Sequence, residues 1–402
     1  MSEPVYAKSI AGYEDAAALE AAVEALFAAL PASERITGKK VLVKPNLLAK
    51  RRPEQAVTTH PAVLAAVLAA VKRRGPASII VAESSGGIAT PSAMKGVYEG
   101  TGIAAVCQKA DVPLWLGSET GERKGDGHIS KTFTIIQPVL DAEFIIDLAK
   151  FKTHMMTGMT GAVKNMFGCI PGLQKAEWHM RCPDKGPFGE MLIDLFEAVK
   201  PDMAVVDAIV AMEGDGPNGG SPRPFGLLLA GEDLPNIDLA LCGLIGLDPM
   251  RVPYLIAAHK RGLCAEKFDT ALWRGDAPYT PVQDFKLPSS YLGSADSTGD
   301  TDFAQKFPAP LRGLARRAEG LLAPHPVIDE VKCIGCGRCK EICPQHTITW
   351  HVTRKGGRPA EAPKPRKVAR VLAKDCIRCF CCHEVCPAQA IEVRRLALFK
   401  KL

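Results

Sequence analysis

Eight cysteines near the C-terminus repeat one spacing twice. Both copies read C-x2-C-x2-C-x3-C-P, and each cysteine of the second copy lies 43 residues after its counterpart in the first. The first copy contains Cys333, Cys336, Cys339 and Cys343, and the second contains Cys376, Cys379, Cys382 and Cys386. Thiolates at this spacing can bind a cubane iron–sulfur cluster, because three cysteines in one tight turn reach three irons and the fourth reaches a neighbouring cluster.

The fourth cysteine of each copy predicts that two [4Fe-4S] clusters share ligands in a crossed arrangement. The predicted ligand sets are Cys333, Cys336, Cys339 and Cys386 for the first cluster, and Cys376, Cys379, Cys382 and Cys343 for the second. Structural zinc is the alternative, since C-x2-C pairs also bind zinc, but a third cysteine three residues on is unusual for zinc. The segment resembles the bacterial ferredoxin with two four-iron clusters. Cys381 stands beside Cys382, and the regular spacing favours Cys382 as the ligand.

Composition places the chain among globular proteins of two or three domains, since it has 402 residues of which 47% are hydrophobic. No stretch approaches eighteen uninterrupted apolar residues, so we expect no membrane span. The first twenty residues lack the pattern of a secretory signal. The six remaining cysteines show no pairing pattern: Cys107, Cys169, Cys182, Cys242, Cys264 and Cys381. Free thiols and clusters together predict a reducing cytoplasm.

The positive charge is concentrated in the cysteine-rich segment. Residues 324–402 contain 16 Lys and Arg against 7 Asp and Glu, a net charge of +9, whereas the rest of the chain carries 34 against 37, or −3. A basic surface could dock an acidic redox partner protein. The cations could equally offset the negative charge of the clusters. We expect no nucleic acid partner.

The N-terminal part alternates strands, polar loops and helices. The strand 41–43 leads into Lys44 and Asn46, and the strand 78–82 leads into Glu83. This alternation predicts an α/β fold with a mostly parallel sheet and flanking helices, followed by a small C-terminal α+β ferredoxin-like module. Ligands of such sheets bind beyond the carboxyl ends of the strands, so Lys44, Asn46 and Glu83 should lie in one crevice. The predicted boundaries are 1–275 for the α/β domain, 276–325 for a linker packing on it, and 326–402 for the module.

A second group of polar residues follows the predicted strand 144–148. Lys150, Lys152 and His154 come directly after it, and Lys164 follows a glycine-containing turn. A helix beginning near residues 157–161 would point its free N–H groups at the same place. Together with Lys44, these residues predict a pocket for a carboxylate, a phosphate or an organic cofactor. Solvated surface lysines are the alternative. The acidic residues Asp207, Glu213 and Asp215 could pair with the lysines, bind a divalent cation or exchange protons; simple ion pairing needs the fewest assumptions.

Four segments of this part together resemble one family. They are residues 41–48, the helix start at 59–61, the Lys152-Thr153-His154 sequence, and residues 161–168. They resemble the domain-of-unknown-function family 362, which is often fused to a ferredoxin module, and the likeness covers most of residues 38–260. The resemblance implies iron–sulfur binding and redox work, and it leaves the substrate open.

These observations favour an iron–sulfur oxidoreductase, although the sequence leaves open whether the protein is an enzyme. Single electrons would pass from the clusters to a small anionic substrate or an unidentified organic cofactor. This substrate or cofactor would be held by Lys44, Asn46, Glu83, Lys150 and Lys164. Lys152 and His154 are the catalytic candidates. The alternatives are an electron carrier or adaptor that docks a larger enzyme, and a non-redox isomerase in which the clusters serve structure.

Overall fold

A computed structural model of the chain describes residues 2–87, 90–291, 308–311, 324–354 and 365–394. Its N-terminal part is built on one sheet with the strand order β10-β1-β9-β8-β6-β2-β3, and β7 pairs with β6. Strands β3, β2, β6 and β8 are parallel neighbours, whereas β9 is antiparallel to both β8 and β1. The strands of this sheet are β1 (Val5–Ser9), β2 (Lys40–Pro45), β3 (Ser78–Val81), β6 (Phe144–His154), β7 (Gly158–Thr160), β8 (Met203–Glu213), β9 (Ser221–Gly231) and β10 (Trp273–Gly275). The predicted mostly parallel α/β fold is confirmed.

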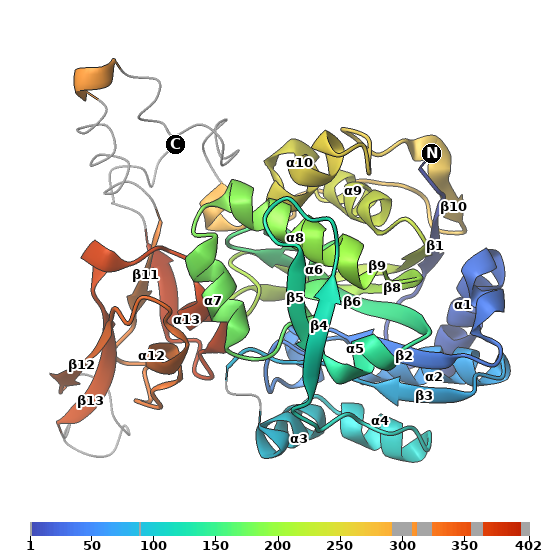
Figure 1. The fold of residues 1–402 in the computed structure, drawn as a ribbon, viewed down its shortest axis with the longest axis horizontal. Helices are drawn as coiled ribbons and strands as arrows, with labels where there is room; N and C mark the ends of the chain where they lie inside the picture. The colour runs from blue at the N-terminus through green and yellow to red at the C-terminus, as the bar shows by residue number, and fades with distance from the viewer. Residues whose placement is uncertain (1, 88–89, 292–307, 312–323, 355–364, 395–402) are drawn as a thin grey trace.

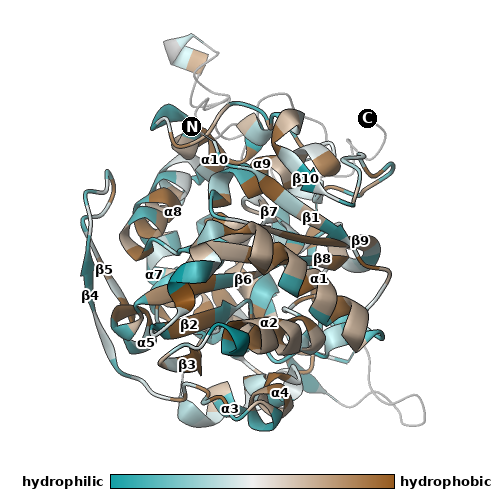
Figure 2. Ribbon diagram, turned by 90° about the vertical axis from the view of Figure 1, so that its right-hand side faces the viewer, coloured by the Kyte–Doolittle hydropathy of each residue, from teal (hydrophilic) through white to brown (hydrophobic). Residues whose placement is uncertain are grey.

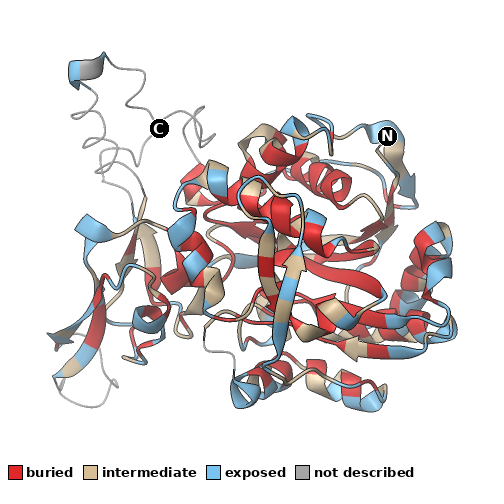
Figure 3. Cartoon of the chain, viewed as in Figure 1, coloured by how far each residue is buried: buried red, intermediate tan, exposed pale blue. Residues whose placement is uncertain are grey.

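Helices cover both faces of the sheet, because hydrophobic residues dominate its central strands on both sides (Figures 1 and 2). One core lies under α1 (Ala16–Ala29), α2 (Pro61–Arg73), α3 (Pro91–Gly100) and α4 (Ile103–Lys109). The other lies under α5 (Gln137–Asp141), α6 (Ala162–Asn165), α8 (Lys185–Val199), α9 (Leu234–Leu244) and α10 (Pro253–Lys260). Figure 3 shows β6 and β8 as buried strands between these layers.

The C-terminal module consists of two similar halves. Strand β11 (His325–Ile328) pairs with β14 (Ile391–Arg394), and β12 (Ile348–Thr353) pairs with β13 (Arg366–Val371). A short helix follows each cysteine loop, namely α12 (Arg338–Ile342) and α13 (Cys381–Val385). Residues 351–373, between the two motifs and dense in Lys, Arg and Pro, predict a hairpin. Its strands are present as β12 and β13, and residues 355–364 at its tip lie outside the described residues. Residues 311–322 predict a short basic amphipathic segment, of which 312–322 also lie outside the described residues.

The module packs beside α7 (Gln174–Arg181) of the α/β domain (Figure 1). Arg51 donates hydrogen bonds to the carbonyls of Pro387, at 2.9 Å, and Cys386. Asn218 Nδ2 lies 3.2 Å from the carbonyl oxygens of both His383 and Cys386. These contacts satisfy carbonyls at the end of α13 and fix this helix against the α/β domain.

Two expected elements differ from the observed ones. The apolar run 133–139 predicts a strand, but the observed strand ends earlier, as β5 (Thr132–Ile136), which pairs with β4 (Thr120–Lys124) outside the main sheet. Gln137 and Pro138 begin α5 instead, because proline fits the first turn of a helix. The strand expected at 144–148 continues to His154, so the lysines lie within β6. The chain then turns through Gly158, whose φ of +83° favours glycine, into β7.

Among the described residues, no helix combines the length and the apolar character needed to cross a membrane.

Candidate functional site

The eight motif cysteines surround two separate cavities in the module. One cavity of about 340 Å³ is lined by Cys333, Cys336, Cys339 and Cys386, and another of about 320 Å³ by Cys376, Cys379, Cys382 and Cys343. The fourth cysteine of each motif therefore faces the cavity of the other motif, which is the grouping that crossed ligation requires. Cys382 lines the second of these cavities, whereas its neighbour Cys381 faces a different pocket.

The thiols fit a cluster better than a single zinc ion. Zinc needs four donors converging at about 2.3 Å from one point. Within the described segments, no group of three or more His, Cys, Asp or Glu side chains is arranged to hold one metal ion. Each quartet instead surrounds a cavity, as ligands of a cubane would. Thiolates of this kind would hold [4Fe-4S] clusters.

Both cysteine loops have the same backbone shape despite different residues. Gly335 and Gly337 of the first loop have φ angles of +67° and +84°. The corresponding residues of the second loop, Arg378 and Phe380, have φ angles of +58° and +60°. Non-glycine residues in this region cost about 1 kcal/mol or more each, so the second loop keeps the cluster-binding turn against a local penalty.

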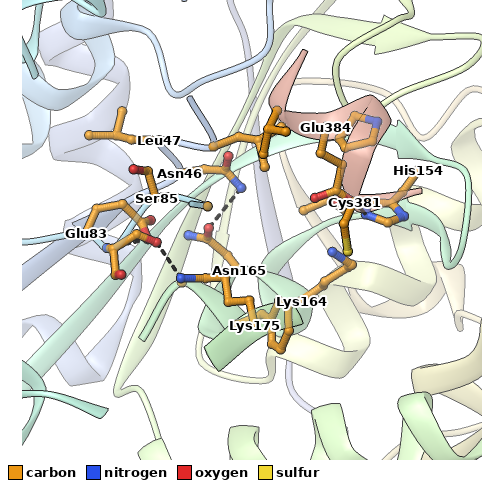
Figure 4. Close-up of a pocket in the computed structure, with 18 of the residues that line it drawn as sticks. Asn46, Leu47, Glu83, Ser85, His154, Lys164, Asn165, Lys175, Cys381 and Glu384 are labelled. Carbon is orange, nitrogen blue, oxygen red and sulfur yellow. Dashed lines mark hydrogen bonds and ion pairs between the residues drawn. The ribbon is translucent and has the colours of Figure 1, made fainter. Parts of the chain in front are cut away.

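A third pocket lies between the α/β domain and the module. It has a volume of about 660 Å³ and lies beyond the ends of β2 and β6 (Figure 4). The α/β domain contributes polar residues from strands and helices: Asn46, Glu83, Ser84, Ser85, Lys152, His154, Thr160, Lys164, Asn165, Lys175 and His179. The module contributes Ile342, Cys381, Glu384 and Val385. In Figure 4, Cys381 and Glu384 lie near His154 and Lys164, at the end of the pocket opposite Glu83.

Several polar atoms lining this pocket have no hydrogen-bond partner in the described part of the chain. They are His154 Nε2, Thr160 Oγ1, His179 Nδ1 and Glu384 Oε1. His154 Nε2 and Glu384 Oε1 are 3.1 Å apart but are not aligned as a hydrogen bond. Buried polar atoms are nearly always paired in native proteins. Thr160 Oγ1 and His179 Nδ1 are therefore available to a bound molecule, whereas His154 Nε2 and Glu384 Oε1 face each other across the pocket wall.

His154 is a neutral hydrogen-bond donor in this pocket. Burial lowers its pKa to about 3, and the charge of Lys164 adds to the effect. The Nδ1 atom accepts from the backbone N–H groups of Met156, at 3.1 Å, and Thr157, at 3.4 Å. The proton of the neutral ring therefore resides on Nε2, which faces Glu384 and the pocket.

Lys152 and Lys175 titrate close to neutral pH. Burial lowers the pKa of Lys152 to about 7, and the charges of Lys164 and Lys150 add to this effect. Its Nζ donates to Asn46 Oδ1 at 2.8 Å and to the carbonyl of Val57 at 2.6 Å. Burial likewise lowers the pKa of Lys175 to about 8. Both ammonium groups are thus poised to gain or lose a proton when a charged ligand binds.

Two of the four predicted anion-binding lysines lie outside the pocket wall. Lys44 Nζ is 2.8 Å from Glu83 Oε2 in a buried ion pair, behind the pocket-facing Glu83. Lys150 Nζ is 2.8 Å from Asp207 Oδ2, as simple ion pairing of that carboxylate predicted. The register of β6 against β8 shifts between Lys150 and Lys152, so alternation did not place both lysines at one site.

The predicted role of a helix N-terminus is wrong. Helix α6 begins at Ala162 with Gly161 as its N-cap, next to the predicted range, but Asp238 accepts from its free N–H groups, from Ala162 at 2.7 Å and Val163 at 3.1 Å. A carboxylate of the chain itself therefore occupies the position expected for a ligand.

Sequence reasoning missed Thr160, Lys175, His179, Cys381 and Glu384 as pocket residues. Lys175 and His179 belong to a helix that follows an irregular Pro-Gly segment, and Glu384 belongs to a module more than two hundred residues away from His154 in the chain. No spacing rule connects such positions. The signal that could have pointed to Cys381 is its place beside a predicted cluster ligand.

Each of the two parts of the chain matches the model of a known protein family. Residues 41–243 match the model of a domain of unknown function, DUF362. The chain belongs to this family. Residues 332–390 match a 4Fe-4S dicluster domain. The C-terminal module of this DUF362 protein is therefore a ferredoxin-like domain that binds 4Fe-4S clusters.

Curated relatives match each part separately. A thylakoid-associated protein of Synechocystis sp. is 35% identical over 252 residues, which are 62% of this chain and 77% of the relative. An uncharacterised ferredoxin of Methanocaldococcus jannaschii is 40% identical over 35 residues, 9% of this chain and 46% of that protein.

Solved structures show only partial likeness. The lactate racemase apoprotein from Thermoanaerobacterium thermosaccharolyticum has a TM-score of 0.36 at 13% identity, over 58% of this chain and 54% of that one. A protein from Thermotoga maritima has a TM-score of 0.32 at 13% identity, over 56% of each chain. The chain thus spans about half the length of these structures, and no activity follows from the comparison.

Proposed function

We propose that this protein is an iron–sulfur oxidoreductase that passes single electrons from two [4Fe-4S] clusters to an anionic substrate or organic cofactor in the interdomain pocket. The observation that carries the proposal is the position of α13. This helix contains Cys382, a ligand of the second predicted set, and it contributes Cys381 and Glu384 to the pocket wall. A five-residue helix thus belongs to both sites, which supports short-range transfer between them.

The charges of the pocket favour a ligand with negative charge. Lys152, Lys164 and Lys175 line it, and Lys164 has no carboxylate partner within 4 Å among the described residues. Burial lowers the pKa of all three lysines. A bound anion would therefore stabilise the charged form of each ammonium group. A ligand that also carries a hydrogen-bond donor would satisfy Thr160 Oγ1.

The pocket residues can balance a two-electron reduction of the ligand. Each cluster would supply one electron, since iron–sulfur clusters transfer electrons singly. Two protons must then reach the reduced ligand. Lys152 is the better proton donor, because its pKa of about 7 lets it lose a proton near neutrality, and solvent supplies the second proton. His154 holds the ligand through Nε2–H, since its Nδ1 is already engaged with backbone N–H groups.

The test measures whether electrons leave through the pocket. Protein purified without oxygen is reduced with dithionite, freed of excess reductant and mixed with a panel of 2-oxo acids, 2-enoates and nitroaromatic carboxylates. We expect at least one compound to reoxidise the clusters, and Lys164→Met to slow that reaction about tenfold or more, because the pocket loses a cation. Lys95→Met, which removes an exposed lysine with 67% of its side chain accessible, is the matched control.

Equal reoxidation rates in the wild type and in Lys164→Met for every compound would overturn the proposal. The adaptor alternative would then gain, since the electrons would leave without using the pocket. Interconversion of a compound without any change in cluster oxidation state would favour the isomerase alternative. The cytoplasmic location expected from the free thiols stays a prediction.

A further inference from the structure

Exposed apolar side chains gather around the first cysteine motif. Val331, Ile334, Trp350 and Val352 are 61%, 66%, 41% and 57% exposed. We call these four residues the outer patch. Single exposed apolar side chains are common on protein surfaces. A contiguous group of large exposed apolar side chains instead indicates a contact surface.

Contacts show that the loop and the hairpin of the outer patch lie together. A Cβ atom added at Gly337 would be 3.6 Å from Cζ2 of Trp350, so the indole ring lies against the cysteine loop. Thr353 Oγ1 donates to Glu330 Oε2 at 2.7 Å, beside Val331 and Val352. Arg366 of β13 donates to the carbonyl of Cys333. Cys336, a ligand of the first predicted set, is itself exposed in the same loop.

Positive charges border the outer patch. Arg338, Lys340 and Lys367 are exposed, and none has a carboxylate within 4 Å among the residues that the structure describes. Lys367 is the strand partner of Val352, and Arg338 follows the loop that contains Ile334. Apolar residues with an aromatic side chain at the centre and charged residues at the rim are the usual composition of a protein docking site.

The second motif faces the opposite way. Cys379 and Cys381 pack with Ala176 of α7 in the α/β domain, and Cys381 lines the interdomain pocket. Strands β12 and β13, which carry part of the outer patch, lie at the end of the module away from that domain (Figure 1). The exposed Cys336 loop and the hairpin thus form the outer end of the module, whereas α13 and Cys386, the fourth cysteine of the first set, lie at its inner end against the α/β domain.

We propose that the outer patch is the electron entry site, where a small acidic one-electron carrier protein docks over Cys336. At each encounter the reduced carrier loses one electron and the Cys333, Cys336, Cys339 and Cys386 set gains one. The second set then relays it to the pocket, so two encounters supply a two-electron reaction. This inference rests on the proposed function for the final acceptor, but the docking itself concerns only cluster reduction.

The experiment follows reduction of the clusters in the absence of any substrate. The full chain with its clusters loaded is mixed under anaerobic conditions with a reduced plant-type two-iron ferredoxin, which serves as the acidic carrier, and separately with dithionite. Lys367→Glu should slow reduction by the ferredoxin about tenfold at low salt, because electrostatic steering governs such encounters. The difference should vanish at high salt, and reduction by dithionite should be unchanged. Lys374→Glu makes the same charge change beside the second motif and should leave the rate within about twofold.

A second variant tests the apolar part of the outer patch. Val352→Ser lies on the exposed side of β12 and should weaken docking several-fold at high salt as well, since the loss is not electrostatic. Equal slowing by Lys374→Glu and Lys367→Glu, or no slowing by Lys367→Glu and Val352→Ser, would overturn the proposal. A dimer of the wild type that Val352→Ser dissociates would also overturn it, because a second copy would then occupy the patch. None of these outcomes depends on the pocket, so the proposed function can fail or hold separately.

Discussion

Lys150 and Lys152 lie two residues apart on β6, and the structure gives them opposite environments. Lys150 Nζ contacts Asp207 at 2.8 Å and the hydroxyl of Tyr13 at 2.9 Å, so a carboxylate neutralises it. Lys152 Nζ contacts only the neutral oxygens of Asn46 and Val57 among the described residues, and its pKa falls to about 7. Both side chains are buried.

The difference shows what separates a structural lysine from a functional one in this fold. A carboxylate partner balances the charge of a buried cation, so that cation has no unbalanced charge with which to bind an anionic ligand. A buried cation with only amide and carbonyl partners retains an unbalanced charge that an anion can compensate. Residue type and spacing are the same in both cases, and the neighbouring carboxylate decides the role.

The largest expected effect is on stability. Lys150→Met should lower the free energy of unfolding by about 3–5 kcal/mol, because it leaves the buried Asp207 without its counter-charge. Lys152→Met should lower it by only about 1–2 kcal/mol, since its partners are neutral. Urea unfolding of the cluster-loaded chain, followed by tryptophan fluorescence, measures both, with Lys95→Met as the surface control. Equal losses for the two buried lysines would remove the distinction between them.

The second prediction concerns pH. Lysines are charged below their pKa, and Lys152 and Lys175 have pKa values of about 7 and about 8. Sulfate, which keeps its charge throughout, should therefore bind most tightly near about pH 6 and about tenfold more weakly near about pH 9. Titration calorimetry at a series of pH values measures this. Lys152→Met should remove the step near pH 7, whereas Lys150→Met should preserve it; the reverse result would exchange the roles of the two lysines.

The smallest expected effect is on sulfate affinity when a carboxylate is placed next to Lys152. Asn46→Asp places the charge at the oxygen that accepts from Lys152, so the pKa of Lys152 should rise and its charge should be balanced. Sulfate affinity near about pH 6 should fall about threefold, and the step near pH 7 should disappear. Gln108→Glu is the matched control, because it adds one negative charge at an exposed residue that does not line the pocket. A step that persists in Asn46→Asp would show that Lys152 is not its source.

Much of the local structure followed from residue patterns. Thr90 before Pro91 predicts a helix start, and Thr90 is the observed N-cap, because its hydroxyl accepts from the N–H of Ala93 in the first turn. The apolar runs 41–43 and 204–210 each predict a buried strand, and both are observed, within β2 and β8. In contrast, the strand predicted over 133–139 stops at Ile136, because Pro138 favours a helical turn over a continued strand.

The sequence by itself determined the cysteine spacing, and with it the iron–sulfur chemistry and the crossed grouping of the thiols, because those ligands lie within short loops of fixed reach. It also determined that lysines, an asparagine and a histidine would end neighbouring strands. Only the tertiary structure decided which of these residues face the pocket. Asp207 and Glu83 pair with Lys150 and Lys44, and Asp238 accepts from the N–H groups that begin α6. Glu384 of the module lies 3.1 Å from His154. Such pairings depend on distances between residues far apart in the chain, which no local pattern encodes.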